Sequence, residues 1–356
     1  MIIKFFISII VSALVSYFLT PLTRNFFIRH SWVENPDSKQ KKTHNATAVS
    51  ATPRGGGLPI FFAILVTSLI FLPLNKYLIG ILLASLLTLI IGIWDDIKDI
   101  SPKLRLVTNI LAAVIVVGSG IGIAYISNPL GGIINFSSAA VKFNFLGSHS
   151  IWIISDLLAI FWITWCMNIT GWAAGVEGQL PGFVAISAIF IGILGLRFSS
   201  DTTQWPVIIL AGAVAGSYLG FLPFNFFPQS IMPGYSGKSL AGFFLALLSI
   251  LSGAKLATLL LLLGVPMIDA IFVIVRRLIH HKSLLKPDGQ HLHHRLLKIG
   301  WSRPQIAIFY WLISLALGLL SLFLNSQQKL YVFIGLFILF FGFLIQIYFK
   351  SPKENT

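Results

Sequence analysis

Residues 77–99 read YLIGILLASLLTLIIGIWDDIKD, an apolar run of 18 residues followed by three acidic residues within five positions. A helix needs about 20 mostly apolar residues to cross the hydrocarbon core of a membrane, so this run predicts a transmembrane helix ending at the membrane surface. The whole chain of 356 residues has the same character, with 56% hydrophobic residues, 10% charged residues and a mean hydropathy of +0.88. Soluble domains carry about a quarter charged residues. The composition therefore predicts an all-α, polytopic integral membrane protein.

The same length rule places eleven transmembrane helices along the chain. They are expected at about 2–20, 57–73, 77–94, 104–126, 151–168, 182–196, 205–222, 239–252, 255–273, 305–323 and 330–349. Basic residues follow the first apolar stretch, at Arg24 and Arg29, which favours a retained helix with an external N-terminus over a cleaved signal peptide. No stretch indicates a soluble domain, so a single transmembrane domain is expected over residues 1–356.

The charge is strongly basic, with 25 Lys and Arg against 11 Asp and Glu and a net charge of +14. In a membrane protein such an excess indicates cytoplasmic loops rather than nucleic-acid binding. Alternating the predicted loops puts 19 of the 25 basic residues on one face, which we therefore expect to be cytoplasmic. Most acidic residues and histidines fall there too, so any chemistry is expected at that surface. The single cysteine, Cys166, excludes a disulfide framework.

Asp95 and Asp96 are adjacent carboxylates at a membrane boundary, where their repulsion calls for compensation. A divalent cation such as Mg²⁺ would supply it, since Mg²⁺ binds carboxylate oxygens and keeps positions open for phosphate. Ser101-Pro102 predicts the start of the next helix, which would leave the acids on a short turn. The alternative is a solvated acidic turn without a function.

The loop from Asn35-Pro36-Asp37 through Lys42 and His44 to Arg54 precedes three glycines, Gly55-Gly56-Gly57. Glycines at a helix start expose backbone N–H groups that can bind phosphate. A basic loop with a flexible entry to the next helix is an equally good interpretation.

The stretch from Asn168 to Gly182 holds four glycines, the acid Glu177 and no basic residue. Glycines let the backbone approach a ligand, and Trp172 offers a flat surface to a base or a sugar. The alternative is a plain flexible loop, which would more commonly carry Ser, Lys and Asp.

Asn225 precedes the stretch Gly234-Tyr235-Ser236-Gly237-Lys238-Ser239, which is not a P-loop. A P-loop has four residues between its first glycine and Gly-Lys, and it follows a strand. Only two residues intervene here, between predicted membrane helices. A glycine-rich helix start that binds an anion remains open.

Three histidines, His291, His293 and His294, follow the basic pair Arg276-Arg277 and Asp288. They could ligate zinc or, when protonated, hold a diphosphate. A surface histidine cluster is an equal alternative. Asp269 lies within a predicted helix, either as a functional acid or in an ion pair with Arg276 or Arg277.

These loops, in this order, resemble the polyprenyl-phosphate N-acetylhexosamine-1-phosphate transferase family. This is the glycosyltransferase 4 group that includes the MurNAc-pentapeptide translocase, and the match is best to its GlcNAc-1-phosphate branch. The motifs that carry the resemblance are Asn35-Pro36-Asp37 with His44, Pro53-Arg54-Gly55-Gly56, Asp95-Asp96, Asn168, and Asp288-x-x-His291-Leu292-His293-His294. Two positions depart from the family pattern: acids expected there are replaced by Ala174 and Tyr235.

The resemblance implies transfer of N-acetylhexosamine 1-phosphate from a UDP-sugar to polyprenyl phosphate, giving a polyprenyl diphosphate-sugar and UMP, with Mg²⁺ or Mn²⁺ as cofactor. It implies a multi-pass protein of the plasma membrane, active on the cytoplasmic face, and it is compatible with a homodimer. The expected catalytic residues are Asp95, Asp96, His291, His293 and His294. The expected substrate-binding residues are Lys42, His44, Arg54, Asn168, Gly175, Val176, Glu177, Asn225 and Arg277. The expected metal ligands are Asp95, Asp96 and Glu177.

Two alternatives remain open at this stage. The first is a relative that no longer catalyses and instead serves as a scaffold or binds lipid or nucleotide; the missing acids favour it, and the retained Asp95-Asp96 pair and histidine motif oppose it. The second is a transporter, which would need ionisable groups near the middle of the membrane. The predicted spans hold almost none, with Asp156 and Asp269 near their ends.

Overall fold

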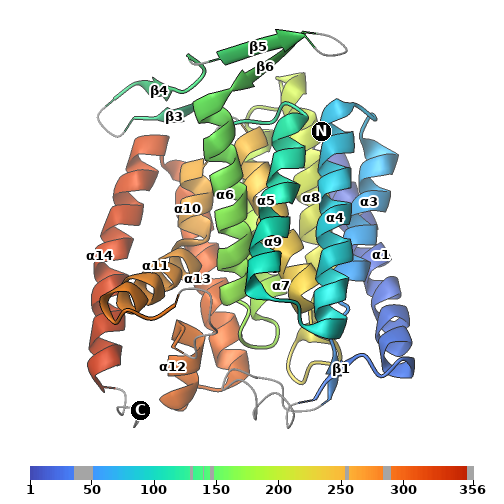
Figure 1. Ribbon diagram of the computed structural model, residues 1–356, viewed down its shortest axis with the longest axis vertical. Helices are drawn as coiled ribbons and strands as arrows, with labels where there is room; N and C mark the ends of the chain where they lie inside the picture. The colour runs from blue at the N-terminus through green and yellow to red at the C-terminus, as the bar shows by residue number, and fades with distance from the viewer. Residues whose placement is uncertain are drawn as a thin grey trace.

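The computed structural model describes residues 1–35, 51–128, 131–138, 140–144, 148–252, 256–283 and 290–350. The protein is a bundle of helices with short strands at its two ends (Figure 1). The helices are α1 (Ile2–Arg29), α3 (Gly57–Phe71), α4 (Lys76–Lys98), α5 (Pro102–Gly118), α6 (Ile153–Trp172), α7 (Gln179–Leu196), α8 (Trp205–Asn225), α9 (Gly234–Leu251), α10 (Leu256–Leu262), α11 (Gly264–Ile279), α12 (Leu292–Lys298), α13 (Arg303–Phe323) and α14 (Ser326–Lys350).

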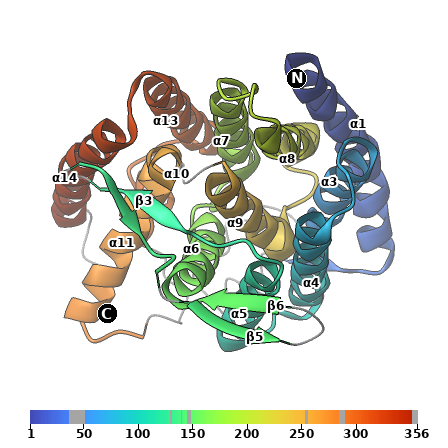
Figure 2. The same cartoon turned by 90° about the horizontal axis from the view of Figure 1, so that it is seen from above.

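The bundle is organised around α8 and α9, whose side chains are buried along most of their length. Helices α1, α3 and α7 pack against α8, and α4 and α6 pack against α9, so the view along the bundle shows α9 near its centre (Figure 2). The outer helices α1 and α14 expose large apolar side chains such as Phe18 and Leu339. Outward-facing apolar side chains on an all-helical bundle are what a lipid environment requires. The predicted all-α membrane fold is therefore confirmed.

A row of glycines lets α1 and α8 approach closely. Gly212, Gly216 and Gly220 recur every four residues on one face of α8. A Cβ atom at Gly216 would lie 2.2 Å from the carbonyl oxygen of Ile9, and one at Gly220 would lie 2.1 Å from that of Ala13. Small residues at this spacing are the usual solution for close helix packing inside a membrane.

The eleven predicted spans each coincide with a helix or with the bent pair α10–α11. In the described part of the chain, eight helices are long and apolar enough to cross a membrane, or nine if the bent pair counts as one span. Helix α3, with 15 residues, is shorter than that length. The count of eleven thus stays a prediction.

Two predicted spans are wrong in detail. The span expected at 255–273 is broken, because α10 and α11 meet at an angle of 80°. Pro266 lacks the N–H that would continue the helix to the carbonyl of Leu262, and Gly264 opens the new direction. The span expected at 104–126 ends at Gly118, where Ser119 and Gly120, the latter with φ of +100°, turn the chain into a strand.

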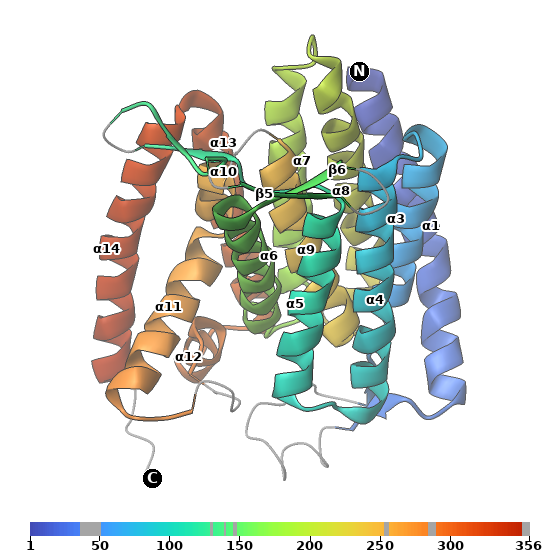
Figure 3. The ribbon, with the colours of Figure 1, turned by 45° about the horizontal axis from the view of Figure 1, so that its top comes forward.

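Two antiparallel hairpins cover one end of the bundle: β3 (Tyr125–Ser127) with β4 (Ile133–Asn135), and β5 (Ala140–Asn144) with β6 (Ser148–Trp152). At the opposite end lie the C-terminus of α4, the short helix α12 and the small strand pair β1 (Val33–Glu34) and β2 (Thr52–Pro53) (Figures 1 and 3). We call this second end the site end, because it gathers the charged loops.

Candidate active site

Asp95 and Asp96 lie in the last turn of α4, with both carboxylates buried. The prediction that they sit on the turn after the helix is therefore wrong. The helix continues to Lys98 and ends where Asp99 adopts a left-handed conformation with φ of +49°. The turn is short because Ser101 caps α5, its side chain accepting the N–H of Leu104, as predicted.

The Asp95 carboxylate is directed at α5. It accepts hydrogen bonds from Arg105 Nε at 2.6 Å and from the backbone N–H of Ile100 at 3.1 Å. Its second oxygen lies 3.4 Å from a guanidinium nitrogen of Arg54. The charge of Asp95 is thus held by two arginines.

The Asp96 carboxylate is directed at the start of α9. It accepts the N–H of Tyr235 at 2.6 Å, and both the hydroxyl, at 2.5 Å, and the N–H, at 3.3 Å, of Ser236. The close approach requires glycine at position 234, with φ of +67°, because a Cβ there would lie 2.3 Å from an Asp96 oxygen. A buried carboxylate at a helix N-terminus is stabilised by the free N–H groups and the helix dipole.

Arg54 connects these acids. It forms ion pairs with Glu34 at 3.4 Å, with Asp99 at 2.7 Å, and with Asp95 and Asp96. Burial by itself lowers the pKa of Arg54, but the carboxylates of Asp96, Glu34 and Asp99 outweigh it and raise the pKa, so the group stays charged. We call Glu34, Arg54, Asp95, Asp96, Asp99 and Arg105 the arginine–carboxylate cluster.

Sequence reasoning missed the parts that Arg105 and Tyr235 play in this cluster. The Arg105 guanidinium lies 5.0 Å from the ring centre of Tyr235, and the Tyr235 hydroxyl donates to Asn109 at 3.1 Å. The sequence offered one signal for Arg105, because it is a basic residue in the first turn of the helix that follows the Asp95-Asp96 pair. Nothing in the sequence signals the Arg105–Tyr235 contact, since the two residues are 130 positions apart.

The three glycines after Arg54 have a packing role in the structure. The N–H of Gly56 donates to the carbonyl of Met232 at 3.0 Å, so it is not available to a phosphate. A Cβ at Gly57 would lie 2.3 Å from the Ser236 hydroxyl. These glycines seat the start of α3 against the segment before α9. Lys42 and His44, predicted to bind substrate from the preceding loop, and Asp37 lie outside the described residues.

The predicted loop between the next two spans is shorter than expected. Helix α6 runs to Trp172 and α7 begins at Gln179, so Asn168 is helical and its side-chain amide donates to the carbonyl of Thr164 at 2.7 Å. The N–H groups of Gly175 and Val176 both donate to the Gln179 side chain at 3.2 Å. This loop, 173–178, is thus held by the first side chain of α7.

Hydrogen bonds of Glu177 and Asn225 connect the loop to α13 and α8. One oxygen of buried Glu177 accepts from Arg303 of α13 at 2.6 Å, whereas its other oxygen is buried without a hydrogen-bond partner in the structure. Asn225 accepts the N–H of Gly178 at 3.1 Å and donates to Ile231, so its observed role is to hold the loop in place.

The histidines lie beside this loop. His291 Nδ1 lies 2.9 Å from Asp269 Oδ2, and the second Asp269 oxygen accepts the N–H of Leu292 at 2.8 Å, so the acid fixes the start of α12. Trp172 stacks on the His291 ring, and the His293 ring lies parallel to that of His291 at 5.9 Å. His294 packs on His293 with ring centres 4.2 Å apart. Arg277 of α11 is buried, and Asp288 lies outside the described residues.

His293 is enclosed. Its side chain fills the space above Gly175, where a Cβ would lie 1.9 Å from Nε2. Nδ1 is buried with no hydrogen-bond partner in the structure. Burial, followed by the charges of His294, His291 and Lys238, lowers the pKa of His293 well below its ordinary value, so its ring is neutral at pH 7. We call His291, His293, His294 and the loop 173–178 the histidine pocket.

The predicted metal ligands Asp95, Asp96 and Glu177 do not form one site. The two aspartates bind arginines and backbone N–H groups, and Glu177 binds Arg303. Over the described ranges, no group of three or more His, Cys, Asp or Glu residues could hold a metal ion. Mg²⁺ is commonly held by one or two carboxylates together with waters and substrate phosphates. In this structure the two aspartates pair with arginines and N–H groups, and the three predicted ligands do not converge on one cation.

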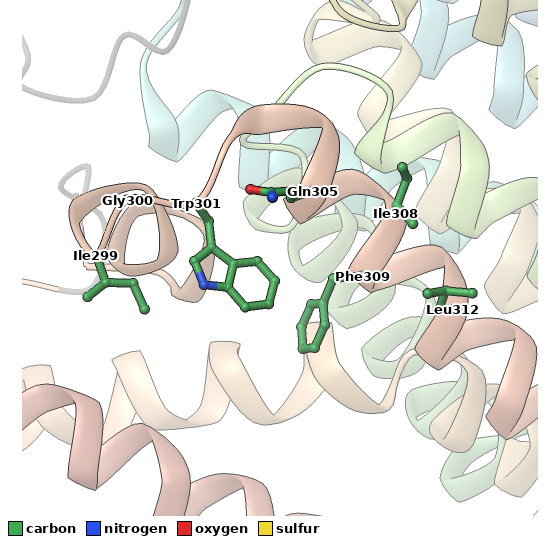
Figure 4. A pocket seen from close by; sticks show the side chains of 7 residues that line it. All are labelled: Ile299, Gly300, Trp301, Gln305, Ile308, Phe309 and Leu312. Atoms are coloured by element: carbon green, nitrogen blue, oxygen red, sulfur yellow. The ribbon is translucent and has the colours of Figure 1, made fainter.

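A separate apolar cavity of about 480 Å³ lies between α12 and α13 (Figure 4). Trp301 and Phe309 form its wall, with Gln305 as the polar side chain. None of the predicted site residues lines it.

The fold and these clusters define a class: a polytopic membrane protein with buried charged groups gathered at one end of its bundle. Comparison with known proteins narrows it. Residues 78–253 match the model for glycosyl transferase family 4. A Bacillus subtilis protein named "probable undecaprenyl-phosphate N-acetylglucosaminyl 1-phosphate transferase" is 26% identical over 95% of this chain and 89% of its own length. The undecaprenyl-phosphate alpha-N-acetylglucosaminyl 1-phosphate transferase of Thermotoga maritima is 28% identical over 96% of this chain and 97% of its own length.

Another relative is the phospho-N-acetylmuramoyl-pentapeptide-transferase of Bacillus pumilus, which is 27% identical over 90% of this chain and 95% of its own length. The chain is thus similar along most of its length to the kind of transferase that its loop motifs predicted, and its residues 78–253 match glycosyl transferase family 4. These relatives are all named as transferases, and the alternative of an inactive relative gains no support from them.

Proposed function

We propose that this protein transfers N-acetylhexosamine 1-phosphate from a UDP-sugar to polyprenyl phosphate, an initiating step in the synthesis of a cell-envelope glycan. The observation that carries the proposal is that the arginine–carboxylate cluster and the histidine pocket lie at the same end of the bundle, beside helices that pack on α9. Helix α4, which bears the acid pair, and helix α6, which leads into the loop, both pack on α9.

The histidine pocket is the proposed donor site. Two of its buried polar atoms, Glu177 Oε2 and His293 Nδ1, have no hydrogen-bond partner in the structure, and neither has Nε2 of the adjoining Gln179. An unpaired buried polar group is costly, and a ligand that pairs with it recovers that cost. The three atoms are a carboxylate oxygen, a ring nitrogen and an amide nitrogen that donates. Such a set suits a nucleotide base or an N-acetyl sugar, which carry both donors and acceptors.

The arginine–carboxylate cluster is the proposed acceptor site. The acids are buried beneath Arg54 and Arg105, whose side chains are partly exposed at 13% and 31%. Asp95 and Asp96 are therefore proposed as positioning residues, and the guanidinium groups as the contacts to the lipid phosphate. Arginine binds phosphate through paired N–H groups, and a carboxylate behind it fixes the side chain in place.

The reaction then joins two anions. A phosphate monoester has a second pKa near 6, so the acceptor is largely a dianion at pH 7 and needs no base. An acceptor oxygen forms a bond to the β-phosphorus of the donor, and the bond from that phosphorus to the bridging oxygen breaks, so UMP leaves with that oxygen. Positioning and positive charge, rather than proton transfer, make up the protein's contribution.

The test is a transfer assay with purified protein, UDP-GlcNAc labelled in the sugar, and undecaprenyl phosphate, in Mg²⁺ buffer and after chelation. We expect lipid-linked label and an equal amount of released UMP. If the protein binds UDP-GlcNAc and the lipid yet releases no UMP in either buffer, the proposed activity is wrong.

We also propose that the site end faces the cytoplasm across the plasma membrane, because 19 of 25 basic residues are expected on that face. The only native cysteine, Cys166, is fully buried, which makes thiol labelling straightforward. In intact cells, Ser137→Cys between the hairpins should react with an impermeant maleimide, and Lys98→Cys at the site end should react only after lysis. The reverse pattern would overturn this orientation.

A further inference from the structure

We infer that Tyr235 is a positioning residue that holds the Arg105 guanidinium ready for the phosphate of the acceptor lipid, an assignment that rests on the proposed function. The two residues come from different helices, Arg105 from the first turn of α5 and Tyr235 from the first turn of α9. The sequence assigned no role to Tyr235, which stands at one of the two departures from the family pattern.

Arg105 is the arginine of the cluster whose N–H groups remain available to a ligand. Its Nε donates to Asp95 at 2.6 Å, and its Nη2 lies 3.9 Å from Asp99, beyond hydrogen-bond distance. Within the described part of the chain its guanidinium donates no other hydrogen bond. Arg54, by contrast, is more deeply buried and pairs with carboxylates through all three of its nitrogens. The phosphate is therefore expected at the Nη groups of Arg105, which form a planar pair of donors.

The Tyr235 ring supports this guanidinium from the side of α9. The guanidinium carbon of Arg105 lies over the ring, 5.0 Å from its centre, which is within the range of a cation–π contact. The carboxylate of Asp95 holds the same side chain at Nε. Held at two places, the guanidinium loses little freedom when it binds a phosphate, and that saving favours binding.

Tyr235 is itself fixed at both ends. Its backbone N–H donates to Asp96 of α4 at 2.6 Å, and its hydroxyl donates to Asn109 Oδ1 at 3.1 Å. Asn109 lies four residues after Arg105 on α5, so one face of that helix presents both groups to the tyrosine. The orientation of the ring, and with it that of the guanidinium, is thus set by the bundle before any ligand binds.

The experiment is a double-mutant cycle on Tyr235→Leu and Arg105→Met in detergent micelles, with Tyr235→Phe and Tyr77→Leu alongside. Leucine removes the ring and keeps an apolar side chain, whereas phenylalanine keeps the ring and removes the hydroxyl. Tyr77 is the matched control, because it lies at the opposite end of α4 with Lys76 Nζ also 5.0 Å from its ring centre. Calorimetric titration measures binding of undecaprenyl phosphate and of undecaprenol, which lacks the phosphate, and thermal unfolding reports whether each variant is folded.

We expect Tyr235→Leu to weaken binding of undecaprenyl phosphate by about 3- to 30-fold, the size of a partly buried cation–π contact, and to leave undecaprenol binding unchanged. Tyr235→Phe should keep most of the affinity, and Tyr77→Leu should match wild type. In the Arg105→Met background Tyr235→Leu should weaken binding no further, because its effect passes through the guanidinium. In the transfer assay Tyr235→Leu should raise the KM for the lipid and keep the KM for UDP-GlcNAc.

Arg105→Lys gives an independent test that leaves Tyr235 in place and also serves if Tyr235→Leu does not fold. Lysine keeps the positive charge but has no planar group to lie over the ring or to bind phosphate through paired donors. We expect this variant to lose affinity for undecaprenyl phosphate as well, and wild-type affinity would overturn the assignment.

Unchanged affinity for undecaprenyl phosphate in folded Tyr235→Leu would also overturn the assignment, as would an equal loss for undecaprenol or additive losses in the double variant. If wild type binds undecaprenyl phosphate in a way that depends on Tyr235 and Arg105 yet transfers no sugar phosphate, the assignment stands and the proposed transferase function fails. If wild type transfers and Tyr235→Leu transfers with the same KM for the lipid, the function stands and the assignment fails.

Discussion

At the scale of single residues, the adjacent aspartates of α4 serve two different neighbours. Successive residues on a helix point about 100° apart, so Asp95 faces Arg105 on α5 and Asp96 faces the start of α9. Arg54 lies against both. Each enclosed carboxylate therefore acts by positioning the groups that it binds. Its removal would free an arginine side chain or the start of α9, and it would not remove a proton-transfer group.

This arrangement predicts a combined defect for Asp96→Asn. The amide would present a donor to the N–H groups of Tyr235 and Ser236. It would also leave the positive charge of Arg54 with one negative charge fewer beside it. Breaking a buried ion pair costs about 3–5 kcal/mol, so both transfer activity and thermal stability should fall. The half-exposed Asp99, paired with Arg54 at 2.7 Å, is the control, and Asp99→Asn should lose less of each. Wild-type turnover by Asp96→Asn would refute the positioning role.

His293 predicts a pH dependence of stability. Burial, then the neighbouring positive charges, lowers its pKa in the folded protein, whereas in the unfolded chain the pKa is about 6.5. The unfolded state therefore binds the proton first, and stability, intact above about pH 6.5, falls as the pH is lowered, by at most about 1.4 kcal/mol per pH unit. Unfolding temperatures from pH 8 to 5 should drop less steeply for His293→Gln than for wild type. The exposed His30→Gln serves as control and should keep the wild-type slope.

At the scale of elements, the loop between α6 and α7 is ordered by packing rather than by chain length. Six residues, 173–178, are held by Gln179, Asn225 and Arg303, and Gly175 leaves the space that His293 fills. Because Gly175 has no side chain, the His293 ring can lie directly against the backbone of the loop.

A pair of glycine substitutions tests this contact. Gly175→Ala would place a Cβ 1.9 Å from His293 Nε2, so His293 must move, and both UDP binding and transfer should fall by at least tenfold. Gly171→Ala, one turn earlier in α6, meets nothing within 4 Å. It should leave binding unchanged and raise stability slightly, because alanine is favoured over glycine in a helix by about 0.5–1 kcal/mol. Equal behaviour of the two variants in titration and thermal unfolding would argue against the contact.

At the scale of the whole molecule, the bundle brings distant segments to one end. The C-terminal end of α4, which carries Asp95 and Asp96, and helix α12 lie at that end, while the hairpins cover the other end (Figure 3). This gathering depends on α8 and α9 being packed on all sides, and the glycine row of α8 is what admits α1.

The packing of α1 gives a prediction at this scale. Gly216→Val would place its Cβ 2.2 Å from the carbonyl of Ile9, and the separation of α1 from α8 should cost about 1–3 kcal/mol or more. Gly335→Val on α14, where a Cβ meets nothing within 4 Å, is the control. Thermal unfolding in detergent should show a large drop for the first variant and little change for the second. A similar small effect in both would mean that α1 packs without the glycine row.

The amino-acid pattern alone was enough for the membrane class, the helix positions and the family, because apolar runs, turn residues and short motifs are local properties of the chain. It also named Asp95, Asp96, Arg54, Glu177 and the histidines as site residues. It could not show that the acids end a helix, that 255–273 bends by 80°, or that Glu177 lies with Arg303 and not with the aspartates. It passed over Arg105, and the contact of Arg105 with Tyr235, for the same reason. Which side chains meet depends on the rotation and packing of helices far apart in the sequence, and only the folded bundle decides that.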